Sequence, residues 1–368
     1  MKESSYDDSF HQLYGKTTFY KYVMYLNDKY LPHINTERPT HSNVTNKLRR
    51  WTMRCHLRNL LTYVLLAVLI LSPTTYANAK KLIPMGESIG IQLQLPFVYV
   101  AHDVLLPNGQ WLKKGDIITE INDQPVDSIE TIKQALSESE ITLSIQQKTN
   151  EERKISLSNE QANNILPFLK DETDGIGTLT YIDPESKQYG ALGHQIIDGV
   201  LNKPPEFTDG SIFLASIEQI KKSSPGNPGY KISVIDRNDL RLGNIVSNDL
   251  YGIFGKWEND LKKTNKKPIE IIDDNEIQLG KAELLTAIEG SKVESFTIEI
   301  IKIEENFLQF EVTDKTLLSK TGGILQGMSG SPILQNDKFV GAVTHMFVEQ
   351  PARGAAITVN EMLKKKPN

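Results

Sequence analysis

The sequence predicts a mainly β protein, with a small N-terminal β domain followed by a larger all-β barrel or sandwich. Two observations lead to this class. From about residue 170 onward, short runs that alternate apolar and polar residues are separated by glycine turns, as in Phe296 to Ile303 and Phe307 to Val312. Between residues 80 and 158, several strand patterns accompany a single helical period at Ile129 to Leu136.

Composition excludes several functional classes. A chain of 368 residues is long enough for one to three domains. The formal net charge of −5 gives no basic surface for nucleic acid, so we expect no nucleic-acid partner. The only cysteine, Cys55, leaves no intramolecular disulfide and no cysteine zinc cluster, and the seven histidines show no metal-ligand spacing. We therefore expect neither a metal nor a cofactor.

The N-terminal region combines a polar and basic segment, residues 1–58, with an uncharged segment, residues 59–79. A basic flank, the apolar core from Leu60 to Leu71 and the small-residue ending Ala77-Asn78-Ala79 are the three parts of a secretory signal. The core of about 12 residues is short for a stable membrane span. Residues 59–79 are thus predicted to be a signal peptide or membrane anchor, and a buried helix is the alternative.

The position of Met53 raises a question about the start of translation. Met53 opens a segment with the shape of an ordinary signal peptide, so either translation starts there or residues 1–52 are an additional tail. In both cases the positive-inside bias predicts that everything after Ala79 lies outside the cytoplasm.

Residues 80–158 are predicted to form the small domain. Ser128 is placed to cap the helix from Ile129 to Leu136. The run Gly115 to Asn122, followed by a turn and this helix, resembles the PDZ family. The resemblance implies a peptide-binding loop that holds a peptide C-terminus through backbone N–H groups. The alternative is a PDZ-like spacer with a closed groove. The implied loop consists of Ser88, Ile89, Gly90 and Ile91.

The segment Gly327-Met328-Ser329-Gly330-Ser331-Pro332 is predicted to be a glycine-rich turn between two strands. Glycines around a serine allow a tight turn whose N–H groups point at a developing oxyanion, so Ser329 is the candidate nucleophile. Ser331 is the weaker candidate because Pro332 restricts its backbone. A simple β-turn of small residues is the alternative to a catalytic turn.

A nucleophilic serine needs a base and a group that orients the base. His194, at the end of a predicted strand, is the candidate base. His345 is its rival, although its alternation with apolar residues favours a structural role or a place in a substrate wall. The candidate orienting acid is Asp314, and Asp236 and Asp239 compete with it.

Four ordered blocks of the chain carry a family resemblance: Gly175 to Thr180, Tyr189 to His194, Thr321 to Pro332 and Gly341 to His345. Together they resemble the SpoIVB peptidase family, serine endopeptidases of endospore-forming bacteria. The resemblance runs from Ser88 to about Leu363 and implies a PDZ domain at 80–158 and a chymotrypsin-like all-β peptidase domain at 165–368. It assigns the nucleophile to Ser329, the histidine to His194 and the essential aspartate to Asp314. By analogy with chymotrypsin-like enzymes, the N–H groups of Gly327 and Ser329 would form the oxyanion hole.

The resemblance also implies a biological role. Such a peptidase is exported from the forespore into the space between the two forespore membranes, where it cleaves itself near its N-terminus. It then clips a membrane-bound inhibitor of an intramembrane protease, which leads to activation of the mother-cell sigma-K factor. The expected partners are protein substrates, including the chain itself and the membrane-bound regulator, and a peptide C-terminus bound by the PDZ domain. Two other functions stay open: a non-catalytic PDZ adaptor with a degenerate peptidase fold, and an esterase that uses the same serine.

Overall fold

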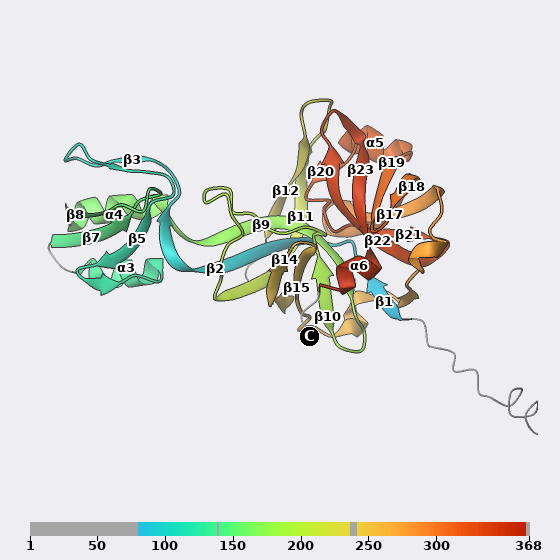
Figure 1. Ribbon diagram of the computed structural model, residues 1–368, viewed down its shortest axis with the longest axis horizontal. Helices are drawn as coiled ribbons and strands as arrows, with labels where there is room; N and C mark the ends of the chain where they lie inside the picture. The colour runs from blue at the N-terminus through green and yellow to red at the C-terminus, as the bar shows by residue number, and fades with distance from the viewer. Residues whose placement is uncertain (1–79, 138–139, 236–240, 366–368) are drawn as a thin grey trace, which may run out of the picture. The chain divides into compact units, whose positions relative to one another are not determined.

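The computed structural model of the chain describes residues 80–137, 140–235 and 241–365 (Figure 1). The described residues fall within one compact unit, Asn78–Asn368. The predictions about a signal or anchor at 59–79 and a start at Met53 lie outside them. None of the helices in the described ranges has the length and apolar character needed to cross a membrane.

Strands dominate the described part of the chain. Those before residue 160 are β1 (Lys81–Pro84), β2 (Ser88–Val100), β3 (Val104–Leu105), β4 (Trp111–Leu112), β5 (Ile117–Ile121), β6 (Gln124–Pro125), β7 (Glu140–Gln146) and β8 (Glu152–Ser158). Those in the middle are β9 (Leu169–Ile182), β10 (Gln188–Ala191), β11 (Asp209–Lys221), β12 (Gly229–Ile235), β13 (Gly243–Asn244), β14 (Ser247–Asp249), β15 (Gly252–Lys256) and β16 (Ile269–Glu270). The last are β17 (Gly280–Glu289), β18 (Lys292–Glu304), β19 (Phe307–Val312), β20 (Leu325–Gln326), β21 (Pro332–Gln335), β22 (Lys338–Phe347) and β23 (Gln350–Thr358).

The described helices are short. They are α3 (Ile129–Ala135), α4 (Asn159–Ile165), α5 (Lys315–Thr321) and α6 (Val359–Leu363), with 3₁₀ turns at Leu166–Phe168, Leu261–Thr264 and Asp274–Glu276. Ser128 caps α3 by accepting a hydrogen bond from the Thr131 N–H, as the sequence predicts.

Two β structures contain most of the chain after residue 169. One is a large sheet whose central path is β14-β15-β10-β9-β2-β11-β12-β20. The other is a closed barrel in the order β17-β18-β19-β23-β22-β21, drawn in orange to red in Figure 1. The prediction of a mainly β fold with a barrel is confirmed. The barrel is filled by its own apolar cluster, which includes Leu284, Ile298 and Phe310.

A shared core joins the barrel to the large sheet. Tyr181 of β9 and Phe254 of β15 are buried in one cluster with Phe339 of β22 and Met362 of α6. The rings of Tyr181 and Phe339 meet edge to face at 6.4 Å. Since burial of large apolar side chains is the main favourable term in folding, this cluster fixes the barrel against the sheet that carries the histidine.

The small domain is a module of residues 98–169 inserted between β2 and β9. Its own apolar cluster runs from Val98 to Leu169 and includes Ile132 of α3. The two strands that enter and leave it pair with each other, with Val100 opposite Leu169. The predicted start of this domain at residue 80 is therefore too early, because Ile83, Ile89 and Leu93 pack in the core of the large sheet.

The predicted peptide-binding loop is wrong in its position. Ser88, Ile89, Gly90 and Ile91 lie in the buried inner strand β2, which pairs with β9 on one edge and β11 on the other. Ile89, Gly90 and Ile91 are paired on both edges, and Ser88 is paired with β9, so the segment from Ile89 to Ile91 has no open edge at which a peptide could add a strand. The sequence suggested otherwise because alternating Ser-Ile-Gly-Ile fits a strand edge as well as an inner strand.

Candidate active site

The turn between β20 and β21 holds Ser329 against the large sheet. Gly327 and Gly330 have φ values of +94° and +93°, a region that side-chain-bearing residues rarely adopt. A Cβ on Gly330 would lie 2.2 Å from the carbonyl oxygen of Thr178 and 2.5 Å from the nitrogen of Leu192. Glycine at position 330 is therefore required for the turn to approach both β9 and the segment that leads to His194.

Thr178 of β9 fastens the turn with two hydrogen bonds. Its N–H donates to the carbonyl oxygen of Ser329 at 3.0 Å, and its Oγ1 donates to the carbonyl oxygen of Gly327 at 2.8 Å. On the barrel side, the Gly330 N–H donates to the carbonyl oxygen of Val343 at 2.7 Å. The catalytic turn, residues 327–331, is thus held by both β structures. Sequence reasoning missed Thr178, whose side chain gives no motif of its own.

Ser329 is half-buried, and its hydroxyl donates to the carbonyl oxygen of Thr344 at 3.1 Å. Its N–H makes no hydrogen bond to the described residues. An amide N–H that is free at a glycine-rich turn can hold a developing oxyanion. Of the two predicted oxyanion-hole groups, the Ser329 N–H is therefore open. The carbonyl that Thr178 holds belongs to the peptide between Gly327 and Met328, on the other side of Gly327 from its N–H.

His194 follows β10 and reaches the same region through the Leu192–Gly193 segment. A Cβ on Gly193 would lie 2.9 Å from the carbonyl oxygen of Val343 and 3.2 Å from Cγ2 of Thr344. This contact places the residue before His194 against Val343 and Thr344, and the carbonyl of Thr344 is the acceptor for the Ser329 hydroxyl. No direct hydrogen bond joins His194 to Ser329 in this structure, a common situation when no substrate is bound.

The imidazole of His194 is oriented by the main chain. Its Nδ1 lies 2.9 Å from the carbonyl oxygen of Gln195. A protonated Nδ1 would donate to this oxygen and leave Nε2 as the acceptor that a general base needs. Asn248 fixes the same segment, since its Oδ1 accepts from the Ile196 N–H at 2.8 Å and its Nδ2 donates to the Ile196 carbonyl at 3.0 Å. Neither Gln195 nor Asn248 was singled out from the sequence.

His345 lies beside His194, with ring centroids 5.6 Å apart and planes inclined by 36°. Burial, and then repulsion from His194, lower the pKa of His345 below its usual value. Its exposed side chain beside His194 is in a position from which it can form one wall of the site.

Asp314 occupies a different position from the one that an orienting acid would take. It is the N-cap of α5, where its Oδ1 accepts from the Leu317 N–H at 2.9 Å and its Oδ2 accepts from the Thr297 N–H at 3.5 Å. No hydrogen bond between Asp314 and His194 occurs in the described part of the chain. Its contacts are those of a helix cap. The competing Asp236 and Asp239 lie outside the described residues.

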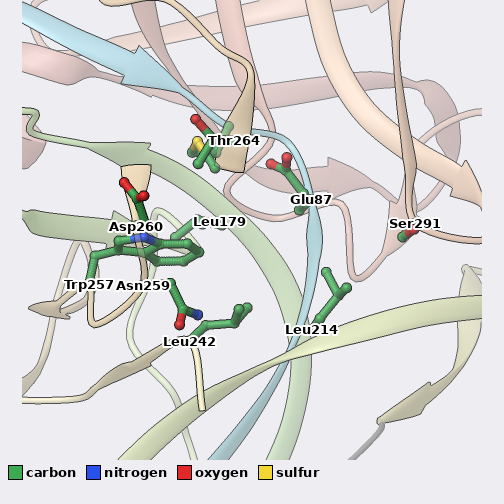
Figure 2. Close-up of a pocket in the computed structure, with 10 residues that line it drawn as sticks. Glu87, Leu179, Leu214, Leu242, Trp257, Asn259, Asp260, Thr264 and Ser291 are labelled. Atoms are coloured by element: carbon green, nitrogen blue, oxygen red, sulfur yellow. The ribbon is translucent and has the colours of Figure 1, made fainter. Parts of the chain in front are cut away.

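A separate cavity of about 410 Å³ lies elsewhere in the fold. Figure 2 shows the Trp257 indole and the Asp260 carboxylate on one side of it, and Glu87 and Leu214 on the other. Its lining includes none of Ser329, His194 and Asp314, so this cavity is distinct from the acyl-transfer site. No cluster of three or more metal-ligating side chains is found among the residues that the structure describes.

A family model described as SpoIVB peptidase S55 matches residues 161–363, which is more than half of the chain. The chain belongs to the SpoIVB peptidase family. As a member of this family it is a serine peptidase. The matched range includes β9, the catalytic turn and His194, and excludes most of the inserted module.

Solved structures of other proteases are similar to this SpoIVB-family chain at low sequence identity. The active form of the Rv3671c protease from M. tuberculosis is 12% identical with a TM-score of 0.33, over 52% of this chain and 73% of that one. The thermostable serine protease AL20 from an extremophilic microorganism is 10% identical with a TM-score of 0.31, over 52% of this chain and 88% of that one. Likeness at this level supports no conclusion about the present site. No curated protein matches the chain.

Proposed function

We propose that the protein is a serine endopeptidase in which Ser329 attacks the peptide carbonyl carbon and His194 accepts its proton. The observation that carries this assignment is the close packing of Gly330 against Leu192. This packing places Gly330, the residue after Ser329, beside the segment that precedes His194, although more than 135 residues separate the two in the sequence.

The reaction begins with rotation of the Ser329 hydroxyl away from the Thr344 carbonyl and toward Nε2 of His194. Transfer of the hydroxyl proton to Nε2 accompanies attack, and the negative charge on the former carbonyl oxygen is held by the N–H groups of Ser329 and Gly327. The imidazolium then protonates the leaving amine, which breaks the C–N bond and gives the acyl-enzyme. Water, deprotonated by His194, hydrolyses the ester and regenerates Ser329.

The Gln195 carbonyl is assigned the role of orienting His194, since it is the group at Nδ1. The family resemblance instead favours Asp314, whose contacts here are those of a cap. If the Gln195 carbonyl orients His194, Asp314→Asn should keep its activity. If Asp314 orients His194, the same variant should lose most of its activity.

The family resemblance supports a more specific role in sporulation. In this proposal the protein is exported by residues 59–79, as a signal or anchor, into the space between the forespore membranes. There it removes its own N-terminal segment and cleaves a membrane-bound regulator of an intramembrane protease, so that sigma-K is activated. The module of residues 98–169 would act as a PDZ domain that binds a peptide C-terminus.

The test is the mass of the purified full chain, followed over time beside Ser329→Ala. Stepwise loss of N-terminal residues in the native chain, absent in Ser329→Ala, is the expected result. Hydrolysis of a panel of peptides and simple esters is measured on both proteins. Ester turnover without peptide cleavage would contradict the endopeptidase assignment, and equal processing of both chains would exclude Ser329 as the nucleophile.

A further inference from the structure

Lys231, on β12, is a buried lysine that the mechanism above does not use. Only 6% of its surface is exposed. Its Nζ lies 3.2 Å from Oγ1 of Thr286, and the described residues place no carboxylate against it. Lysines are rarely buried without an opposite charge, because removing an ammonium group from water is costly. We therefore expect the buried Lys231 to lower the free energy of unfolding.

Lys231 is connected to the far end of the catalytic turn by two hydrogen bonds. Thr286 of β17 is fully buried, and its Oγ1 lies 3.0 Å from the Oγ of Ser331, which is also fully buried. Ser331 is two residues beyond the nucleophile. The Ser331 main chain in turn bonds to Met328 and Val343. A chain of three buried polar side chains thus links the lysine amine to the segment that positions Ser329.

The stem of Lys231 also supports the near end of the turn. A Cβ on Gly327 would lie 3.3 Å from Cδ and 3.6 Å from Cβ of Lys231. Gly327 is one of the two residues whose N–H groups are assigned to the oxyanion hole. Both ends of the turn, at Gly327 and at Ser331, therefore depend on the placement of this one side chain.

Among the residues that the structure describes, no charged group contacts Lys231. The groups that contact it are the Thr286 hydroxyl of β17 and the Gly327 backbone of the turn, and its strand neighbour on β11 is Ile220. Burial lowers the pKa of Lys231 to about 7, with no contribution from another ionisable group. The amine donates to Oγ1 of Thr286, which also accepts from the Ser331 hydroxyl, so the Thr286 hydroxyl joins the lysine to the turn.

We propose that Lys231 is a positioning residue of the peptidase: its amine, acting through Thr286 and Ser331, holds the catalytic turn in the conformation in which Ser329 reacts. This inference rests on the proposed function, because it assumes that Ser329 is the nucleophile. Protonation would keep this donor but would place a positive charge beneath the turn, with no carboxylate among the described residues to offset it.

The decisive variant is Lys231→Met in the full chain, which keeps an unbranched apolar stem and removes the amine. We expect kcat to fall about tenfold or more with little change in KM, while the thermal unfolding midpoint at pH 7 is unchanged or higher. The activity limb near pH 7 that belongs to Lys231 should disappear from the pH profile. Lys221→Met, the same change at an exposed lysine of the preceding strand β11, is the matched control and should leave both quantities unaltered.

Two outcomes would overturn the proposal: Lys231→Met with kcat within twofold of Lys221→Met, or a loss of activity that only parallels a lower unfolding midpoint. Thr286→Val and Ser331→Ala break the same chain without touching Lys231 and should lower kcat in the same way, and wild-type activity in both would also refute it. Ser329→Ala is measured in parallel. Activity in Ser329→Ala would refute the proposed function itself, whereas an inactive Ser329→Ala beside an unaffected Lys231→Met would refute only the role of Lys231.

Discussion

The hydroxyl of Ser329 donates to the carbonyl oxygen of Thr344 at 3.1 Å, and the residue after Thr344, His345, lies against the ring of His194. The candidate nucleophile lies on the turn after β20, its resting acceptor and His345 lie on β22, and His194 lies on the segment after β10. Rotation about the Ser329 side-chain bond would release the hydroxyl from the Thr344 carbonyl.

Thr178→Val should reduce kcat about tenfold to a hundredfold with a small change in KM. Valine keeps the shape of threonine but leaves the Gly327 carbonyl without the hydrogen bond that fixes its peptide, a loss of about 1–3 kcal/mol. Steady-state kinetics on a peptide substrate measure the effect.

The matched control for Thr178→Val is Thr180→Val on the same strand. The Thr180 Oγ1 is buried and has no partner among the described residues, so its removal should leave activity unchanged and stability unchanged or higher. Equal kinetics for the two variants would contradict the role given to Thr178.

Gly330→Ala should unfold the protein or lower its free energy of unfolding by more than about 3 kcal/mol, because a Cβ would overlap the Thr178 carbonyl oxygen. Gly109→Ala separates the steric effect from the backbone effect. Gly109 has a φ of +82° but open space around it, so its loss should cost only about 1–2 kcal/mol. Chemical denaturation gives both values, and a Gly330→Ala protein as stable as Gly109→Ala would disprove the tight packing.

Asp314→Asn should keep activity within a fewfold of the native chain, since asparagine caps a helix as well as aspartate. Asp314→Ala should cost about 1 kcal/mol of stability through loss of the cap. A drop of kcat by about 10⁴ in Asp314→Asn, with an unchanged unfolding midpoint, is the result expected of an orienting acid. It would move that role from the Gln195 carbonyl back to Asp314.

His345 should introduce a pH dependence of stability on the acid side. Its pKa is lowered in the folded protein by burial and by His194. Below about pH 6.5 the unfolded chain binds a proton at this residue and the folded chain does not, so stability falls as the pH drops from 6.5 to the folded pKa. Denaturation at several pH values should show this slope, and His345→Gln should remove the part that belongs to His345.

The coupling of the two rings gives a separate measurement. His194→Gln removes the neighbouring imidazole charge, so the pKa of His345, followed by NMR, should rise toward its ordinary value. An unchanged titration of His345 would mean that burial alone accounts for its shift.

The sequence alone was sufficient for features that local chemistry determines. The glycines around Ser329, the cap at Ser128 and the alternating strands of the barrel each have a short-range signature, and all appear as predicted. His194 was chosen for its place at a strand end, and the structure brings it to the Ser329 region through Gly193 and Gly330.

Features that depend on pairing between distant segments were not predictable. The pattern Ser88 to Ile91 has the same period of two whether one or both edges are paired, so its burial between β9 and β11 could not be inferred. Lys231 is an ordinary strand residue in the sequence, and only the approach of Thr286 and Gly327 makes it unusual. The cap role of Asp314 depends on α5, a helix that was not predicted from the sequence.

The closed barrel has a consequence for the order in which a newly made chain becomes complete. His194 is synthesised 135 residues before Ser329, and the barrel that supports Ser329 closes only when β23, ending at Thr358, pairs with β19 and β22. A growing chain therefore contains the candidate base long before the candidate nucleophile is supported by a closed barrel. If Ser329 is the nucleophile, a polypeptide that has not yet reached Thr358 has no supported catalytic turn with which to cleave itself.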